Sequence, residues 1–303
     1  MRYNPEKTSF GRHETFPLRF GWLTKGFQGL RGNANVFNDP EATVTLGVGK
    51  NMVHAIAYWM HTMRLAEPND GGFKPTALGN LLLGEQGDPY LEDEATLWLL
   101  HWLIASNPQQ ATGFFWFFNR FSLPRFSESE VQSALEAFVQ QSIKRKAKST
   151  LKSDVNTLLR MYSPTAVRGD VPSEDSFDSP MSLLRLVQPR PGRQFLSGWG
   201  LQPNLPSFVL GYAVAELFAA QPEKIALPVR DLLRSDGIWP APGAVFRLSE
   251  EGLLHKLEAF VAACAEHFDL RETAGIHQIY RLPSSGTHGL NPLVLLESHY
   301  HTV

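Results

Sequence analysis

Apolar residues at helical spacing dominate the chain. Between residues 50 and 64, Val53, Ile56 and Met60 recur every three or four positions, which predicts a helix with one buried face. The same spacing predicts helices over 18–30, 93–106, 111–121, 128–140, 150–162, 207–220 and 250–265. Strand-like runs are short and confined to 243–248 and 275–282. A mainly α fold is therefore expected.

Interruptions of this pattern divide the chain into three expected domains. Gly, Gln and Pro residues between 84 and 89 end a first domain, residues 1–88. A stretch rich in Pro, Asp, Ser and Gly from 164 to 180 is expected to be a linker. It separates a helical middle region, 89–165, from a C-terminal α+β domain, 166–303, whose last residues from 283 on are expected to form a tail. A length of 303 residues fits two or three domains.

The first domain has the order of elements of a winged helix-turn-helix. Asp39 and the proline after it predict the start of a short helix, because Asp caps free N–H groups and Pro fits the first helical position. A Gly-Val-Gly turn then precedes a longer helix that opens at Lys50. The run 67–72 is a hairpin-turn sequence, and Thr76 is expected to cap the helix after it. The alternative is a plain helical subdomain without a ligand.

The polar face of the long helix is expected to contact DNA. Its first residues suit a phosphate and a base edge, since Lys neutralises phosphate charge and Asn carries a donor beside an acceptor. A mid-chain basic cluster at 144–148 is a second candidate, with a solvated helix end as its alternative. The residues predicted to contact DNA are Lys25, Lys50, Asn51, His54, Tyr58, Arg64, Lys74, Lys144 and Arg145. A winged helix that binds protein in place of DNA is the alternative.

A weaker version of the same pattern lies near the C-terminus. Residues 226–234 predict a helix, a Ser-Asp-Gly turn follows, and Leu-Ser-x-x-Gly-Leu-Leu at 248–254 resembles Thr-x-x-Gly-x-Leu-Leu at 76–82. The C-terminal α+β domain is therefore a candidate for a second winged helix.

Composition narrows the class of protein. The formal charge of −2 argues against a purely electrostatic nucleic-acid binder, but residues 1–75 hold nine Lys/Arg against six Asp/Glu, so the basic surface is regional. The single cysteine, Cys264, excludes a disulfide framework. The sequence has neither a secretory leader nor an apolar run long enough to span a membrane. A soluble, cytoplasmic protein is expected.

Several short runs resemble one known family. They are GRHETFPLRFGWLTKG at 11–26, LGVGKNMV at 46–53, YW at 58–59, LEDEATLWLLHW at 91–102 and FFN at 117–119. Together they resemble the domain-of-unknown-function family four-thousand-and-seven, closely over about 11–120 and more loosely beyond. Members of this family lie beside genes for phosphoadenosine-phosphosulfate-reductase-like proteins in bacterial defence islands that carry DNA phosphorothioation systems.

The resemblance implies a role in modification of the DNA backbone and in antiviral defence. The best-understood relatives are similar to the B component of single-stranded phosphorothioation, a Mg²⁺-linked DNA nickase that opens a strand for sulfur insertion. DNA, an ATPase and a sulfur-inserting reductase-like protein are the implied partners, and a homodimer is a further expectation. The alternatives are a non-enzymatic DNA-binding adaptor for those partners and, less favoured, a transcriptional regulator.

A nickase of this kind needs a carboxylate for Mg²⁺ and an acid or base near the phosphate. Glu14 is the expected metal ligand, His13 the expected acid or base, and Arg19 the expected partner of the developing phosphate charge. The alternative is that His13 and Glu14 have a structural role and anchor the N-terminal arm.

Other polar or aromatic clusters have a simpler structural interpretation. The acidic run 92–94 is expected to begin a helix, and the aromatic run 114–118 is expected to be core. His101 is expected to be a core histidine, and residues 299–301 a solvated tail. The spacing of a phosphate-binding loop and a Gly-x-Ser-x-Gly elbow are both absent from the sequence.

Overall fold

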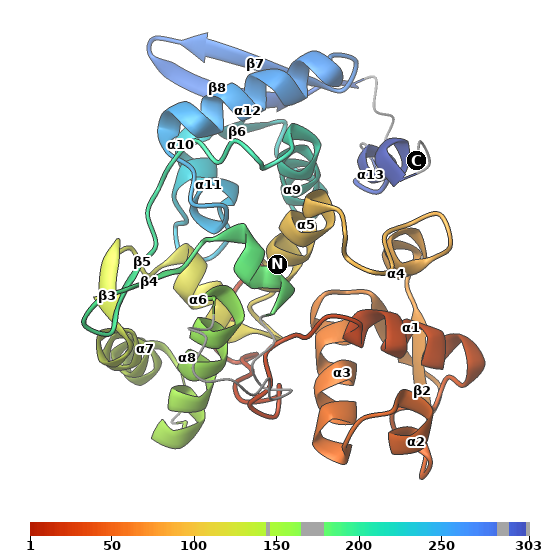
Figure 1. Cartoon of the computed structure of the whole chain (residues 1–303). Helices are drawn as coiled ribbons and strands as arrows, with labels where there is room; N and C mark the ends of the chain where they lie inside the picture. Colours follow the sequence, from red (N-terminus) through yellow and green to blue (C-terminus); the bar gives the residue numbers. More distant parts are fainter. Residues whose placement is uncertain (144–145, 165–178, 284–290, 301–303) are drawn as a thin grey trace.

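The computed structural model describes residues 1–143, 146–164, 179–283 and 291–300 (Figure 1). Helices predominate, and the strands form small antiparallel sheets, in line with the expected mainly α fold. Two predicted DNA contacts, Lys144 and Arg145, lie outside the described residues, as does most of the expected linker at 164–180.

The N-terminal part contains three helices followed by a hairpin and a fourth helix, at the lower right of Figure 1. The elements are α1 (Trp22–Gly32), α2 (Ala42–Leu46), α3 (Lys50–Thr62), β1 (Ala66–Asn69), β2 (Gly72–Pro75) and α4 (Ala77–Leu83). Asn69 lies opposite Gly72, so the hairpin turn is where the sequence predicts it. Thr76 caps α4 by accepting from the backbone N–H of Gly79 at 2.9 Å. A Cβ at Gly79 would lie 2.1 Å from the carbonyl oxygen of Leu65, so a side chain has no room there.

The middle part begins with the helix α5, which lies near the centre of the molecule between this part and the C-terminal helices (Figure 1). The elements are α5 (Glu94–Ala105), α6 (Thr112–Asn119), β3 (Arg125–Ser127), α7 (Glu128–Ser142), α8 (Lys148–Tyr162), the 3-10 helix η2 (Pro180–Leu184), β4 (Gln188–Arg190) and β5 (Gln194–Leu196). Every residue of α5 after Glu94 is buried, because the helix is apolar on all sides. Ser127 begins α7 with a capping box to Glu130.

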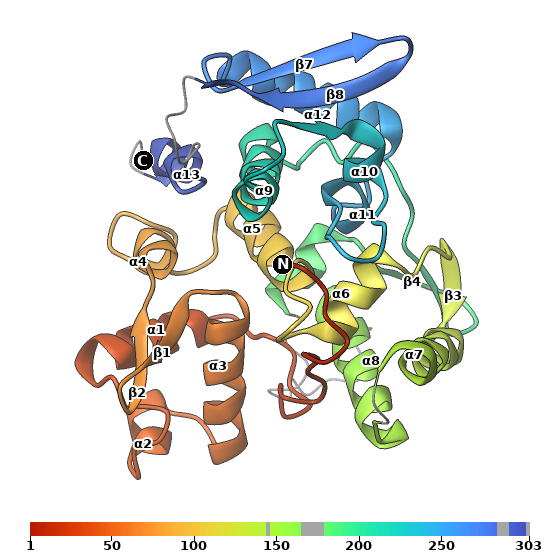
Figure 2. The same ribbon diagram turned by 180° about the vertical axis from the view of Figure 1, so that it is seen from behind.

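The C-terminal part forms the top of the molecule in Figures 1 and 2. The elements are α9 (Ser207–Ala220), β6 (Ala226–Pro228), α10 (Val229–Leu233), α11 (Pro242–Val245), α12 (Glu250–Ala263), β7 (Phe268–Thr273), β8 (Ile276–Arg281) and α13 (Val294–Tyr300). Ser249 caps α12 by accepting from the N–H of Gly252, as Thr76 does with Gly79 in α4. The similar sequences at 76–82 and 248–254 thus both begin helices.

The two three-stranded sheets share one topology. In each, a strand is followed by helices and then by two more strands, and the last strand pairs between the other two, in the orders β3-β5-β4 and β6-β8-β7. The N-terminal part has the same order of helices and hairpin without the first strand. The chain therefore contains a repeated arrangement that its sequence does not reveal as a repeat.

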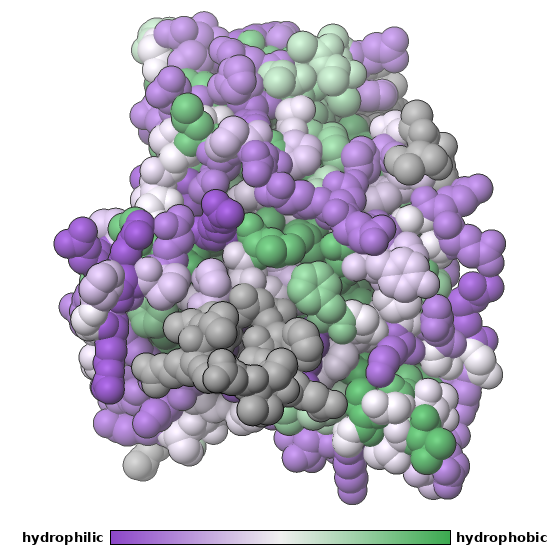
Figure 3. Space-filling view, in the orientation of Figure 1, coloured by the Kyte–Doolittle hydropathy of each residue, from purple (hydrophilic) through white to green (hydrophobic). Residues whose placement is uncertain are grey.

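The three parts share one hydrophobic core, which extends from Leu18 to Tyr300. β3 pairs with β5 across the expected boundary at residue 165, and α13 contacts both α4 and α9. Figure 3 shows a mostly hydrophilic face with apolar residues near its centre and at the lower right, where Figure 1 places α2.

Two sequence predictions in the C-terminal part are wrong. The expected strand at 243–248 begins as α11, because the proline at 242 starts a helical turn that Ala241 opens. The expected tail contains α13, whose Leu296 and Tyr300 are buried. There the Tyr300 hydroxyl is 2.8 Å from that of Thr96. No helix in the described parts of the chain is both long enough and apolar enough to cross a membrane.

Candidate functional site

The turn at residues 11–16 carries the candidate residues His13 and Glu14. Glu14 and Thr15 both have left-handed backbones, with φ of 51° and 66°. Two consecutive non-glycine residues in this region are uncommon and cost conformational energy, so the surroundings must hold the turn in place. Strain of this kind is often found at functional sites, and in this turn His13 is buried while Glu14 is exposed.

His13 is anchored inside the protein by Asp154 of α8. Its ring is 1% exposed, and its Nε2 lies 2.9 Å from Oδ1 of Asp154. The backbone N–H of Thr15 donates to Nδ1 at 3.1 Å, so in the neutral ring the proton is on Nε2 and points at the carboxylate. The same carboxylate oxygen accepts from the N–H of Gly11 at 2.6 Å. Both ring nitrogens of His13 are therefore engaged within the protein, and neither faces a ligand from solvent, in contrast to the expected acid–base role.

Glu14 opens instead on a cavity of about 670 Å³ beside α3, which we call the α3 cavity. The polar side chains that matter for its chemistry are Glu6, Arg12, Glu14, His54, Tyr58 and His61. The cavity thus combines two carboxylates with a guanidinium, the ammonium group of Lys7 and two imidazoles within reach of solvent. Three of the predicted site residues, Glu14, His54 and Tyr58, meet here.

The helix α3 supplies three of these side chains because of its two-faced sequence. Val53, Ile56 and Met60 face the core, whereas His54, Tyr58 and His61 lie at four- and three-residue spacing on the cavity side. Tyr58 donates to the carbonyl oxygen of Gln110 at 3.1 Å, and burial, assisted by the charge of Asp154, raises its pKa well above the ordinary value. Tyr58 therefore acts as a neutral wall of the cavity at physiological pH.

A second hollow, of about 610 Å³, lies at the start of α3. It is lined by Arg19, Lys25 and the Gly-Val-Gly turn, and Lys50 and Asn51 are exposed on the first turn of the helix next to it. The guanidinium of Arg19 rests over the rings of Phe16 and Trp22 at 5.6 and 5.5 Å. Arg19 thus lines a different hollow from Glu14, and the structure separates the three expected catalytic residues.

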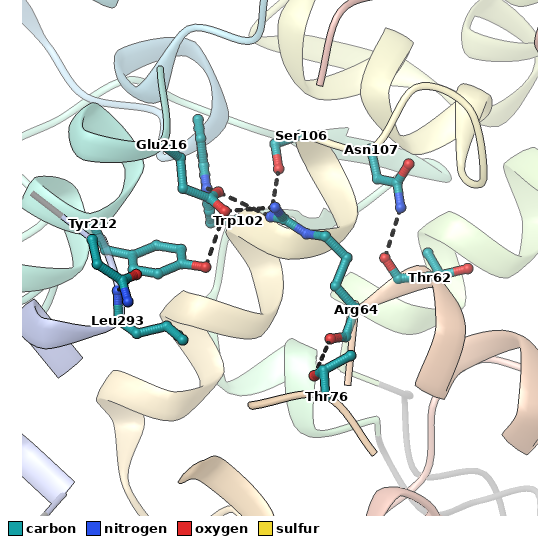
Figure 4. Close-up of polar contacts among 10 residues, drawn as sticks. Thr62, Arg64, Thr76, Trp102, Ser106, Asn107, Tyr212, Glu216 and Leu293 are labelled. Carbon is teal, nitrogen blue, oxygen red and sulfur yellow. Dashed lines mark hydrogen bonds and ion pairs between the residues drawn. The ribbon is translucent and has the colours of Figure 1, made fainter. Parts of the chain in front are cut away.

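Arg64 has a structural partner, as Figure 4 shows. Its guanidinium makes a two-pronged pair with Glu216 of α9 at 2.6 and 3.0 Å. Trp102 and Tyr212 donate to the same carboxylate at 2.7 and 3.0 Å. Burial disfavours the charged form of Arg64 and on its own would lower its pKa. The attraction of the Glu216 carboxylate outweighs this effect and raises the pKa of Arg64 above its ordinary value. This pair occupies the guanidinium that the sequence assigns to DNA.

Lys74 is also paired, although on the surface. Its Nζ lies 3.1 Å from the carboxylate of Glu67 across the β1–β2 hairpin, and both side chains are about half exposed. An exposed pair of this kind is weak and leaves the ammonium accessible to another anion.

The sequence did not predict Asp154 and Glu216, which hold other site residues in place, nor Glu6 and Arg12 in the lining of the α3 cavity. A signal for Asp154 exists, because it falls on the apolar stripe of α8 between Leu151 and Leu158, where a charged residue is unusual. Glu216 likewise interrupts the apolar run of α9. Their partners could not be identified from sequence, since His13 and Arg64 lie more than 140 positions away.

The described ranges contain His, Cys, Asp and Glu side chains that could in principle bind a metal ion. Within them, no three His, Cys, Asp or Glu residues come together in a way that could hold a metal ion. The α3 cavity offers two carboxylates from the segment before α1 and two histidines from α3.

Comparison with known proteins places the chain in a family. A profile of the family described as "Protein of unknown function (DUF4007)" matches residues 10–300. The chain belongs to this family. A search of curated proteins finds no match.

Two solved structures share the fold of this DUF4007 protein. They are described as "SspB crystal structure" and "Magnesium ion-bound SspB crystal structure". Each is 30% identical to this chain with a TM-score of 0.84, and the match covers 96% of this chain and 88% of the other. The family resemblance expected from the motifs at 11–26 and 46–53 is confirmed.

Proposed function

We propose that this protein is the DNA-binding component of a DNA phosphorothioation defence system and that it nicks DNA to allow sulfur insertion. The observation that carries the proposal is the similarity to SspB over 96% of the chain. SspB corresponds to the B component of single-stranded phosphorothioation that the sequence resembles. An ATPase and a reductase-like protein are the partners that such a role requires.

The DNA contact is assigned to the N-terminal helices and hairpin acting as a winged helix. In this arrangement α3 is the recognition helix. Its first turn, with the exposed Lys50 and Asn51, enters the major groove of the DNA. The hollow beside them adds Arg19 and Lys25, two cations suited to a phosphate. The β1–β2 hairpin, with Lys74 at its surface, serves as the wing.

The α3 cavity is the proposed place of reaction. Mg²⁺ usually keeps several waters and takes one or two protein carboxylates plus substrate phosphate oxygens. The donor set of the cavity fits this requirement, because Glu14 and Glu6 are both exposed carboxylates that line it. When bound there, the ion would supply charge stabilisation to the phosphate.

The remaining roles go to residues of the cavity wall. The exposed guanidinium of Arg12 would hold the scissile phosphate. His54, exposed on α3, takes the acid–base role that the sequence assigns to His13. His61 donates from Nδ1 to the carbonyl oxygen of Ala66 at 3.3 Å. In the neutral ring its Nε2 is therefore an acceptor. His13 becomes a positioning residue that fixes the turn bearing Glu14.

The test is conversion of supercoiled plasmid to the open circle by purified protein with Mg²⁺, repeated with chelator. Glu14→Gln keeps the shape of the side chain but removes its charge, so we expect a loss of nicking of about 100-fold or more with unchanged duplex binding. Glu41→Gln, at an exposed carboxylate before α2 and outside the cavity, is the matched control. Wild-type nicking by the Glu14 variant would place the site elsewhere, and no nicking by the wild type would favour the adaptor.

A further inference from the structure

A third hollow runs along α8 and has no part in the proposed reaction. It has a volume of about 590 Å³, and we call it the α8 groove. One face of α8 forms its floor through Ser149, Lys152, Ser153, Asn156 and Arg160, which recur at three- and four-residue spacing, and Ser163 follows at the end of the helix. Thr15 and the aromatic ring of Phe195 line its sides. The only carboxylate among its described lining residues is that of Glu128.

Two polar atoms in the α8 groove are buried without a hydrogen-bond partner among the described residues. They are Oδ1 of Asn156 and Oγ of Ser163, and Ser163 as a whole is 7% exposed. Buried polar groups in folded proteins are nearly always paired, so an unpaired one at the wall of a cavity calls for an explanation. A ligand that brings its own donors and acceptors would pair both atoms.

The other lining groups define the chemistry of that ligand. Lys152 and Arg160 are exposed cations about two turns apart, which suits phosphate. The amide of Asn156 offers the donor–acceptor pair that recognises a base edge. The half-buried ring of Phe195 offers a stacking surface for a base. The two cations, the amide and the aromatic ring together suit the phosphate, the base edge and the base face of a nucleotide.

We propose that the α8 groove binds a nucleotide of single-stranded DNA, with phosphates on Lys152 and Arg160 and the base between Asn156 and Phe195. A single strand is required because the Watson–Crick edges of a duplex are already paired and its bases are stacked on one another, whereas a splayed base can pair with Asn156 and stack on Phe195. The inference rests on the proposed function in one respect, namely that the substrate is DNA.

The groove lies directly beside the proposed site of reaction. The turn at residues 11–16 borders both hollows, since Glu14 lines the α3 cavity and its neighbour Thr15 lines the α8 groove. Asp154, which anchors this turn through His13, belongs to the same helix as Asn156. One strand can therefore be cut at Glu14 and held by α8 next to the cut.

The test is fluorescence anisotropy with a labelled 15-nucleotide single strand, the matching duplex, and AMP as competitor. Asn156→Ala should weaken binding of the single strand about fivefold or more and leave duplex binding unchanged. Because Oδ1 of Asn156 has no partner in the described parts of the chain, its removal should leave the melting temperature unchanged. Lys152→Gln with Arg160→Gln should lower the salt slope for the single strand by about 1.4.

Lys148→Gln is the matched control, because it removes the same charge from α8 at a residue that pairs with Glu136 and does not line the α8 groove. Wild-type affinity for the single strand in Asn156→Ala, or an equal loss for the duplex, would overturn the inference. Binding of AMP without binding of the oligonucleotide would also overturn it and assign the groove to free nucleotides. If the protein binds the single strand through α8 but never nicks DNA, this inference stands and the proposed nickase function is wrong.

Discussion

His101 is a histidine whose protonation is fixed by its surroundings. It is fully buried in α5, where Nε2 donates to the carbonyl oxygen of Val245 and Nδ1 accepts from the hydroxyl of Tyr162, each at 2.8 Å. Burial lowers its pKa to about 3, so the folded protein keeps the ring neutral. The sequence indicates a core histidine here, because its neighbours are apolar on all sides. It does not reveal that the ring joins α5 to α8 and α11.

The first prediction concerns stability in mild acid. Below pH about 6.5 the unfolded chain protonates His101 and the folded chain does not, so stability falls as the pH drops through this range toward 3. Between pH 7 and pH 5 this group alone should remove about 2 kcal/mol from the free energy of unfolding. Urea titrations of the wild type and of His101→Gln at both pH values measure the difference. An equal loss in both proteins would contradict the prediction, and His255→Gln, at an exposed site on α12, is the matched substitution.

At the scale of elements, local signals in the sequence were sufficient for most helices. The caps at Thr76 and Ser127 and the apolar stripe of α3 are encoded within a few residues, so their positions follow from spacing. The short strands could not be predicted in this way. β3 has three residues and gains its hydrogen bonds from β5, some seventy positions later, so nothing local marks it as a strand. The candidate site could not be predicted from local sequence either, because Glu14 and His54 are distant in sequence and line one cavity only in the folded protein.

The second prediction concerns α3 as the recognition helix. Replacing Lys50 and Asn51 by Ala should weaken duplex binding severalfold and lower its salt slope by about 0.9 for the lost phosphate contact. Folding should be unaffected, because both side chains are exposed on the first turn of the helix. A gel-shift titration at several salt concentrations measures both effects, with Arg31→Ala at the exposed end of α1 as control. Unchanged affinity would remove α3 from the DNA interface.

At the scale of the whole molecule, a few polar contacts join parts that are distant in sequence. Glu216 of α9 binds Arg64 at the end of α3 and Trp102 of α5, so one carboxylate connects all three parts of the chain (Figure 4). Arg247, 2% exposed, donates to the carbonyl oxygens of Phe117 and Phe121 at the end of α6. The negative end of a helix suits a buried cation. These contacts add to the shared hydrophobic core in joining the three parts.

The third prediction concerns this carboxylate. Glu216→Gln leaves the charge of Arg64 without its counterion and should lower the free energy of unfolding by about 2–3 kcal/mol. The loss should be smaller than for a fully buried pair, because the side chain of Arg64 is 32% exposed. The same change at Glu67, in the exposed pair with Lys74, should cost less than about 1 kcal/mol. Chemical denaturation compares the two variants, and equal costs would show that Glu216 contributes no more than a surface charge.

The pairing of β3 with β5 also has a consequence for synthesis of the chain. Phe126 lies opposite Phe195, so the first strand of the middle sheet leaves the ribosome about seventy residues before the strand that pairs with it. At 5–20 residues per second the delay is roughly 4–14 s. During that time α7 and α8 are already made, but the sheet beside them is incomplete, so the nascent chain exposes an unpaired strand edge. A chaperone that holds nascent chains can bind this exposed edge before β5 is made.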